Sequence, residues 1–166
     1  MLAVGAGSFV RVDFEPQQNH STMVKQQQVD RNIQFLGDQK NDSILIGNYG
    51  DAKITAIGNF DLSGLIFCRK STVEFDVAGE GIARFKGICK QLIINRIEGN
   101  CTLDLRELSC QIVRCEVVKG KSVVILGKIR TLELIQVDDE SSVKYEGGPL
   151  IINHSSTAME NLRSVA

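Results

Sequence analysis

The sequence predicts an all-β protein wound as a parallel β-solenoid, with coils of about 20 residues. Three observations carry this prediction. Valine and isoleucine total 32 of the 166 residues against 8 alanines, and branched Cβ atoms favour strands over helices. Short runs alternate apolar and polar residues, as in VEFDV at 73–77 and VKY at 143–145. Apolar positions also recur at a period near twenty, which is typical of a solenoid.

The repeat becomes visible when the chain is written in windows of twenty residues from residue 51 onward. Three columns of apolar residues then appear, and a solenoid would bury each of them as an inward ladder at the strand spacing of about 4.8 Å. The first column holds Ile57, Val77, Ile97, Val117 and Val137; the second holds Leu65, Phe85, Leu105, Ile125 and Tyr145; the third holds Ala83, Leu103, Val123 and Val143.

The cysteines show a related spacing. Cys68, Cys89 and Cys110 are separated by 21 residues each time, which predicts a ladder of stacked thiols. A neighbouring ladder is predicted for Val73, Ile94 and Cys115. Small, apolar and reduced side chains are the role expected of these cysteines.

Turn-forming clusters separate the alternating runs. They contain Gly, Asn, Asp and Pro, which tolerate positive φ or favour tight turns, and they lie at residues 79–81, 98–100, 119–121, 138–140 and 147–149. The segments between them are too short for crossover helices. A leucine-rich repeat is the competing interpretation of the period, but its motif occurs once, at residues 105–113, and no window contains the helical half of such a repeat.

We expect one domain over residues 1–166. Residues 1–43 are expected to form N-terminal strands and a cap, including an alternating run at 9–14 and a glutamine-rich stretch at 17–28. Residues 44–152 are expected to form the regular coils. Residues 153–166 are expected to be a C-terminal cap or last strand, with Thr157 and Glu160 in the form of a capping box.

The charge balance and composition exclude several partners. With 19 basic against 20 acidic residues, no large positive field is available to attract nucleic acid or an anionic membrane. No apolar run approaches the roughly 20 residues of a membrane span, so we expect no membrane insertion. The five cysteines are odd in number and form no C-x-x-C pair, which disfavours a disulfide framework or a zinc site.

The compartment is left open between two alternatives. The opening segment has no charged n-region and its apolar run is broken by Gly5 and Gly7, which with the free cysteines favours the cytoplasm. If a leader has been removed, the protein is instead expected at the cell envelope or outside the cell.

No group of residues in the sequence marks a catalytic, cofactor or metal site. His20 and His154 lie far apart in polar stretches, with no nucleophile and acid placed to complete a triad. Residues 5–7 begin like a dinucleotide fingerprint, but Val10 replaces its third glycine. The acidic run at 138–140 lacks the spaced ligands of a calcium loop and is interpreted as a solvated turn.

A family resemblance is carried by the turns and the tail. The segment SSVKYEGGP at 141–149, followed by Ile151–Ile152 and Ser155–Ser156, resembles the ending of the head GIN domains, a family of adhesin-head proteins exported by bacteria. GNCTLDLREL at 99–108 and SVV at 122–124 resemble its small-residue turns and following strands. Over residues 44–165 the resemblance implies a right-handed β-solenoid with a surface or scaffold role, and it supplies no catalytic residues.

The function expected from these observations is a non-enzymatic structural or adhesive binding module for a protein or glycan partner. The alternative is a self-assembling scaffold like the bactofilins, which would form homo-oligomers through solenoid faces or ends. A third class is a carbohydrate-active β-helix enzyme, which would use outward carboxylates, here Glu74, Asp76, Glu98 and Glu116. No cofactor is expected for any of them.

Overall fold

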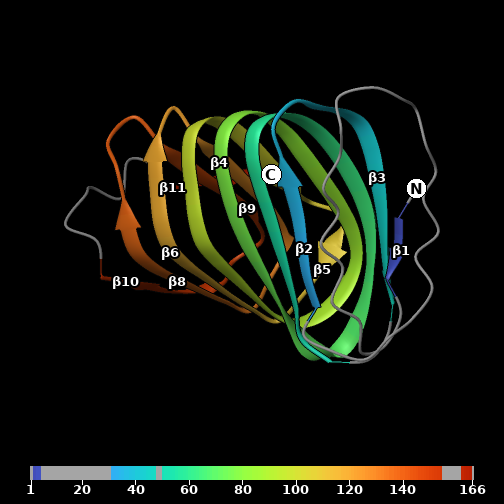
Figure 1. Cartoon of the computed structure of the whole chain (residues 1–166). Helices are drawn as coiled ribbons and strands as arrows, with labels where there is room; N and C mark the ends of the chain where they lie inside the picture. The colour runs from blue at the N-terminus through green and yellow to red at the C-terminus, as the bar shows by residue number, and fades with distance from the viewer. Residues whose placement is uncertain (1, 5–30, 48–49, 155–161, 166) are drawn as a thin grey trace.

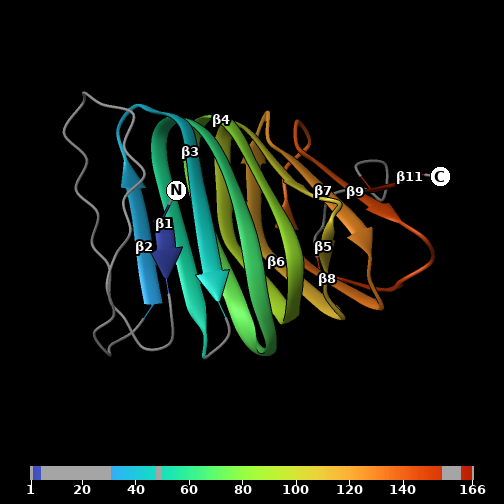
Figure 2. The same ribbon diagram turned by 90° about the vertical axis from the view of Figure 1, so that its right-hand side faces the viewer.

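The computed structural model describes residues 2–4, 31–47, 50–154 and 162–165. In these ranges the chain is all-β, without a helix, and forms a parallel β-solenoid of about six turns (Figures 1 and 2). The strands are β1 Leu2–Val4, β2 Arg31–Leu36, β3 Gln39–Gly47, β4 Ala52–Leu105, β5 Leu108–Ser109, β6 Ile112–Gly120, β7 Val123–Lys128, β8 Thr131–Val137, β9 Ser142–Glu146, β10 Leu150–Asn153 and β11 Leu162–Val165.

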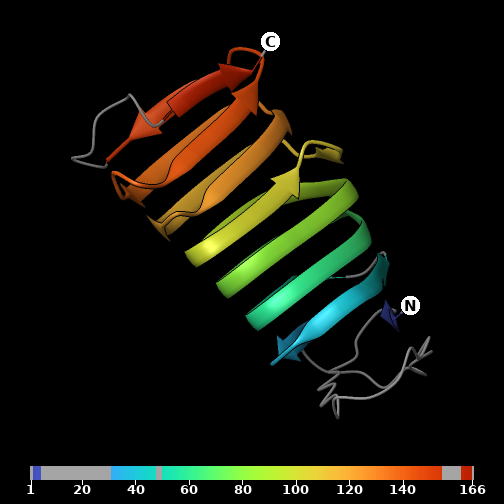
Figure 3. The same cartoon turned by 90° about the horizontal axis from the view of Figure 1, so that it is seen from above.

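The solenoid has two faces, which enclose one apolar core (Figure 3). Face A consists of β2, residues 52–57, 73–78 and 91–99 of β4, and β6, β8 and β10. Face B consists of β1, β3, residues 60–68, 82–90 and 102–105 of β4, and β5, β7, β9 and β11. The 54-residue β4 therefore winds through several coils and contributes to both faces.

The first predicted column is confirmed at three of its five positions. Val77, Ile97 and Val137 are buried, and the strand pairing extends their ladder through Val118, which lies between Ile97 and Val137. Ile57 and Val117 were wrongly included. Ile57 pairs with Leu36 and is 41% exposed, while the inward residue of that coil is the neighbouring Ala56.

Unequal coil lengths explain the error. The register offset is 21 residues from Ile97 to Val118 but 19 from Val118 to Val137, so a fixed window of twenty slips by one residue between them. Because side chains alternate between the two sides of a strand, a slip of one exchanges inside for outside.

The same slip affects the other two columns. Phe85 and Leu105 are buried as predicted and Tyr145 packs partly against the core, but Leu65 and Ile125 point outward. In the third column Ala83, Leu103 and Val143 are buried, whereas the inward residue of the remaining coil is Val124 in place of Val123.

Stacked glycines form the corner that leads from face A to face B. Gly58, Gly79, Gly99 and Gly120 all have positive φ, a conformation that other residues rarely adopt. A Cβ on Gly79 would lie 2.1 Å from the carbonyl oxygen of Gly58, and a Cβ on Gly99 would lie 2.2 Å from that of Gly79. The coils therefore approach too closely here for any side chain.

The predicted cysteine ladder is present inside the opposite corner. Cys68, Cys89 and Cys110 are buried, and the register of Gly87 with Leu108 places Cys89 beside Cys110. All five cysteines are free thiols. The hydrogen bond with Cys110, together with burial, raises the pKa of Cys89, and burial raises the pKa of Cys115 to about 12. Cys89 and Cys115 therefore stay protonated at neutral pH, which suits a packing role.

The two ends of the chain are described only in part. The strands expected early in the chain include β1, β2 and β3, while the run at 9–14, the glutamine-rich stretch at 17–28 and the capping box at 157–160 lie outside the described residues. At the C-terminus β11 is a strand that pairs with β9.

Candidate functional site

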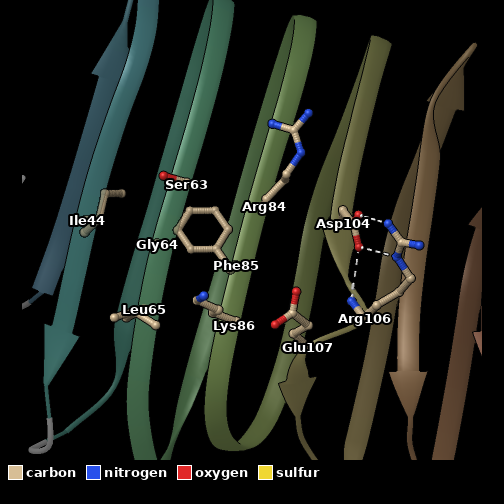
Figure 4. A pocket seen from close by; sticks show the side chains of 10 residues that line it. All are labelled: Ile44, Ser63, Gly64, Leu65, Arg84, Phe85, Lys86, Asp104, Arg106 and Glu107. Atoms are coloured by element: carbon tan, nitrogen blue, oxygen red, sulfur yellow. Dashed lines mark hydrogen bonds and ion pairs between the residues drawn. The ribbon is translucent and has the colours of Figure 1, made fainter.

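A groove with a volume of about 560 Å³ lies on face B, across four successive coils (Figure 4). The buried residues Ile44, Gly64 and Phe85 contribute to its lining. The remaining lining residues are mostly polar or charged, namely Ser63, Leu65, Arg84, Lys86, Asp104, Arg106 and Glu107. It is the candidate functional site because it combines concavity with a group of charged side chains on a regular scaffold.

A turn between β4 and β5 shapes one side of the groove. Two residues, Arg106 and Glu107, separate the inward Leu105 from the inward Leu108, where regular alternation would place one. The turn is anchored because the backbone N–H of Gly87 donates to the carbonyl oxygen of Glu107 at 3.0 Å. Its extra residue brings two charged side chains to the edge of the groove.

Gly64 makes room for an aromatic ring beneath the groove. A Cβ at Gly64 would lie 2.4 Å from Cε1 of Phe85, so the ring occupies the space that a side chain would need. Phe85 also contacts Phe75 of face A across the core, with ring centroids 5.0 Å apart. The groove is therefore backed by packed aromatic side chains.

Asp104 and Arg106 form the most ordered polar group of the groove. The Nε and Nη2 atoms of Arg106 donate to the two carboxylate oxygens of Asp104 at 3.0 and 2.6 Å, and the backbone N–H of Arg106 donates to the same carboxylate at 3.2 Å. The Arg106 guanidinium lowers the pKa of Asp104, with a smaller contribution from Arg84. Asp104 is therefore ionised at neutral pH.

The other charged side chains of the groove form fewer ion pairs and hydrogen bonds than Asp104 and Arg106. Arg84 donates through Nη1 to Asp61 at 2.9 Å, and both side chains are half exposed. Within the described part of the chain, Lys86 and Glu107 form no ion pair, so a ligand would meet a cation and an anion that are available to it.

This arrangement is suited to binding. The lowered pKa of Asp104 does not suit it to act as the acid of a glycosidase, which must stay protonated near neutral pH. The charged donors and acceptors are instead suited to hydrogen bonds and ion pairs with a polar ligand.

The carboxylates singled out in the sequence lie elsewhere, on face A and its glycine corner. Glu74 accepts a hydrogen bond from Asn95 at 2.8 Å, and Asp76 accepts one from Arg96 at 2.8 Å, with Glu98 3.8 Å from the same arginine. Glu116 is bound by Arg114 at 2.6 Å. Each of these four carboxylates thus interacts with a polar side chain on its own or a neighbouring coil. None of the four lines the groove.

The remaining candidates are also apart from the groove. The acidic run at 138–140 lines a second, smaller hollow beside Gly120, of about 420 Å³. His154 lies 3.4 Å from Glu133 on face A, while His20 and residues 5–10 lie outside the described residues. Among the described residues, no cluster of three or more His, Cys, Asp or Glu is placed to hold a metal ion.

The groove residues were not identified from the sequence. The available signal was the interruption of alternation in LDLREL at 103–108, which marks an irregular turn but does not indicate which side chains meet there.

Comparisons with known proteins found no relative from which a function could be transferred to this chain. No protein-family model, curated protein or solved structure matches this chain. In the described residues, no helix is long and apolar enough to cross a membrane.

Proposed function

We propose that this chain is a non-enzymatic structural or adhesive binding module, whose groove on face B receives an extended segment of a protein or glycan partner. The observation that carries the proposal is the groove itself, in which five charged side chains surround a cavity on a regular sheet face. Membership of the head GIN family, implied by the turn and tail motifs, is part of the same proposal.

The scaffold supports this role because it needs little rearrangement to present the site. Arg84 and Lys86 project from one arm of β4, residues 82–90, and Asp104 projects from the next arm, residues 102–105. Parallel pairing holds such neighbouring arms at the strand spacing of about 4.8 Å. Arg106 is held further by its bidentate pair with Asp104. Preorganised side chains lose less conformational freedom on binding, which favours affinity.

A glycan array and a peptide array probed with the whole chain would test the proposal. Ligands that bind saturably are then measured with Lys86→Glu and Arg106→Glu, and with Lys121→Glu as a control of equal charge change at the glycine corner. We expect at least a ten-fold loss of affinity in the groove variants and less than a two-fold change in the control. An absence of saturable ligands on both arrays, or ligands insensitive to the groove variants, would contradict the proposal.

A second candidate function, a self-assembling scaffold, is favoured by the last coil of the solenoid. Among the described strands, β10 pairs with β8 alone and β11 with β9 alone, so each leaves one edge open. Leu150 and Ile152 of β10 are 65% and 39% exposed. An open strand edge beside exposed apolar side chains is a template for pairing with another chain.

Sedimentation over a hundred-fold range of concentration, together with electron microscopy, would test assembly. The scaffold predicts concentration-dependent oligomers or filaments that the double variant Leu150→Lys/Ile152→Lys abolishes, since charges on an edge oppose pairing. A monomer at every concentration would exclude this second candidate and leave the binding module in place.

A further inference from the structure

Next to the groove, two neighbouring arms of β4 present a row of basic and apolar side chains. Phe67 and Arg69 point outward from one arm, and Lys86 and Lys90 point outward from the next. The arms are in register because a Cβ on Gly87 would lie 2.0 Å from the carbonyl oxygen of Ile66. Phe67 therefore lies beside Ile88, and Arg69 lies beside Lys90. Together with Lys70 at the corner, we name these residues the cationic strip: Phe67, Arg69, Lys70, Lys86 and Lys90.

The cations of the strip differ from four arginines elsewhere on the molecule, each of which has a counter-charge. Arg84, Arg96, Arg106 and Arg114 each form an ion pair with a carboxylate. In the ranges that the structure describes, none of the four cations of the strip does so, and all four are exposed. A ligand that binds them need not break an existing pair.

The spacing of the strip suits a polymer with regularly placed negative charges. Neighbouring arms are about 4.8 Å apart, and outward positions two residues apart on one arm are separated by roughly 6.6 Å. Phe67 is 45% exposed between these cations, so it offers an apolar ring surface in the middle of the positive charge. A sugar ring has an apolar face that packs on an aromatic ring, and acidic polysaccharides carry their charges on successive sugars.

We propose that the cationic strip binds an anionic polysaccharide, with a sugar ring on Phe67 and its carboxylate or sulfate groups on Arg69, Lys86 and Lys90. This inference rests on the proposed binding function and names its ligand class. Single-stranded nucleic acid is the other polymer with flat units and negative charge, but its binding proteins stack successive bases on several aromatic rings. Phe67 is the one exposed aromatic side chain among the described residues, and its neighbours Leu65 and Ile88 are aliphatic.

Binding to polygalacturonate, measured by titration calorimetry with the whole chain, tests the inference. The matched probe is the same polymer fully methyl-esterified, which keeps the sugar backbone and removes the charge. We expect saturable binding to the acid form that weakens as salt rises, and at least ten-fold weaker binding to the ester. Dextran sulfate, which carries sulfates and no carboxylates, separates the two groups, and a preference for either agrees with the proposal.

Variants locate the binding on the strip. Arg69→Ala/Lys90→Ala is expected to lower the affinity roughly ten-fold at low salt, and Phe67→Ser is expected to lower it several-fold. The control Lys119→Ala/Lys121→Ala removes the same charge from the glycine corner and is expected to change the affinity less than two-fold. All these side chains are at least partly exposed, and an unchanged thermal midpoint shows that each variant folds.

Three results would overturn the inference: equal binding to the ester, an equal loss in the control variant, or tighter binding to oligo(dT) than to polygalacturonate. Equal binding to the ester would leave a glycan-binding module that reads neutral sugars, so the proposed function would survive. Failure of every polymer here, while array ligands remain sensitive to Lys86→Glu, would reject the strip and retain the groove.

Discussion

The two faces of this solenoid share one core but differ in how their charges are arranged. On face A, Arg96 and Arg114 are matched with acids from the same or a neighbouring coil, as in the Arg96 pairs with Asp76 and Glu98. On face B, cations of the strip stand beside an exposed phenylalanine without such partners in the described structure. Arg96 and Arg114 of face A thus already have ion-pair partners within the protein. The cations of the strip on face B can instead gain ion pairs from a ligand.

The largest expected effect concerns the core that joins the faces. Phe75 comes from face A and Phe85 from face B, and their rings are in contact. Replacing either by Ala is expected to lower the free energy of unfolding by about 3–5 kcal/mol. The double variant is expected to lose about 1 kcal/mol less than the sum of the two, because the ring pair is removed only once.

Urea unfolding of the four proteins in this cycle measures the coupling. The control cycle pairs Phe75→Ala with Leu132→Ala, which is three coils away and is expected to be additive. Strict additivity for the two phenylalanines would show that the faces are not joined through these rings.

The second effect concerns the support of the groove. Gly64→Ala is expected to cost roughly 1–3 kcal/mol, because its Cβ would overlap the Phe85 ring and force it to move. Gly148→Ala is the matched control, since nothing lies within 4 Å of its Cβ. Equal urea midpoints for the two variants would contradict the packing described beneath the groove.

A smaller effect compares the paired and unpaired cations directly. Arg96→Met on face A is expected to cost about 0.2–1 kcal/mol at low salt, and less at high salt, because it removes an exposed ion pair. Lys86→Met on face B is expected to leave the unfolding free energy within about 0.5 kcal/mol, since no pair is lost. A larger and salt-dependent loss for Lys86→Met would mean that this lysine is also paired, and the difference between the faces would disappear.

The smallest effect is a pH dependence from the groove carboxylate. The pKa of Asp104 is lower in the folded protein than its value of about 3.9 in an unfolded chain. Its stabilising contribution is therefore complete above that pH and is lost as the pH falls through the folded pKa. Asp104→Asn should flatten the acid side of the stability profile. Identical profiles for wild type and Asp104→Asn would reject this assignment.

The architecture was predictable because it depends on patterns that the chain repeats. Alternation set the strands, the period near twenty set the coils, and the 21-residue spacing of Cys68, Cys89 and Cys110 located a true ladder. The exact register was less accessible. Coils of 19 and 21 residues average to twenty, so Val77 and Ile97 were placed correctly while Ile57 was placed one residue from the inward Ala56.

The candidate site was not predictable for a different reason. Arg84, Asp104 and Arg106 meet because a two-residue turn disturbs one coil and because Gly64 admits the Phe85 ring from the next. Both are single, local departures from the repeat, whereas periodicity averages over all coils. Sequence patterns therefore located the scaffold, and the structure was needed to show which charges remain without partners on it.

Thiol labelling of two single-cysteine substitutions tests the stacked register most directly. Ile57→Cys should react rapidly with an iodoacetamide probe in the native protein, while Ala56→Cys should react only after unfolding, as the five buried native thiols should. This contrast is expected because Ala56 lies in the inward file with Phe35 and Val77. A protected Cys at 57 together with a reactive Cys at 56 would contradict it.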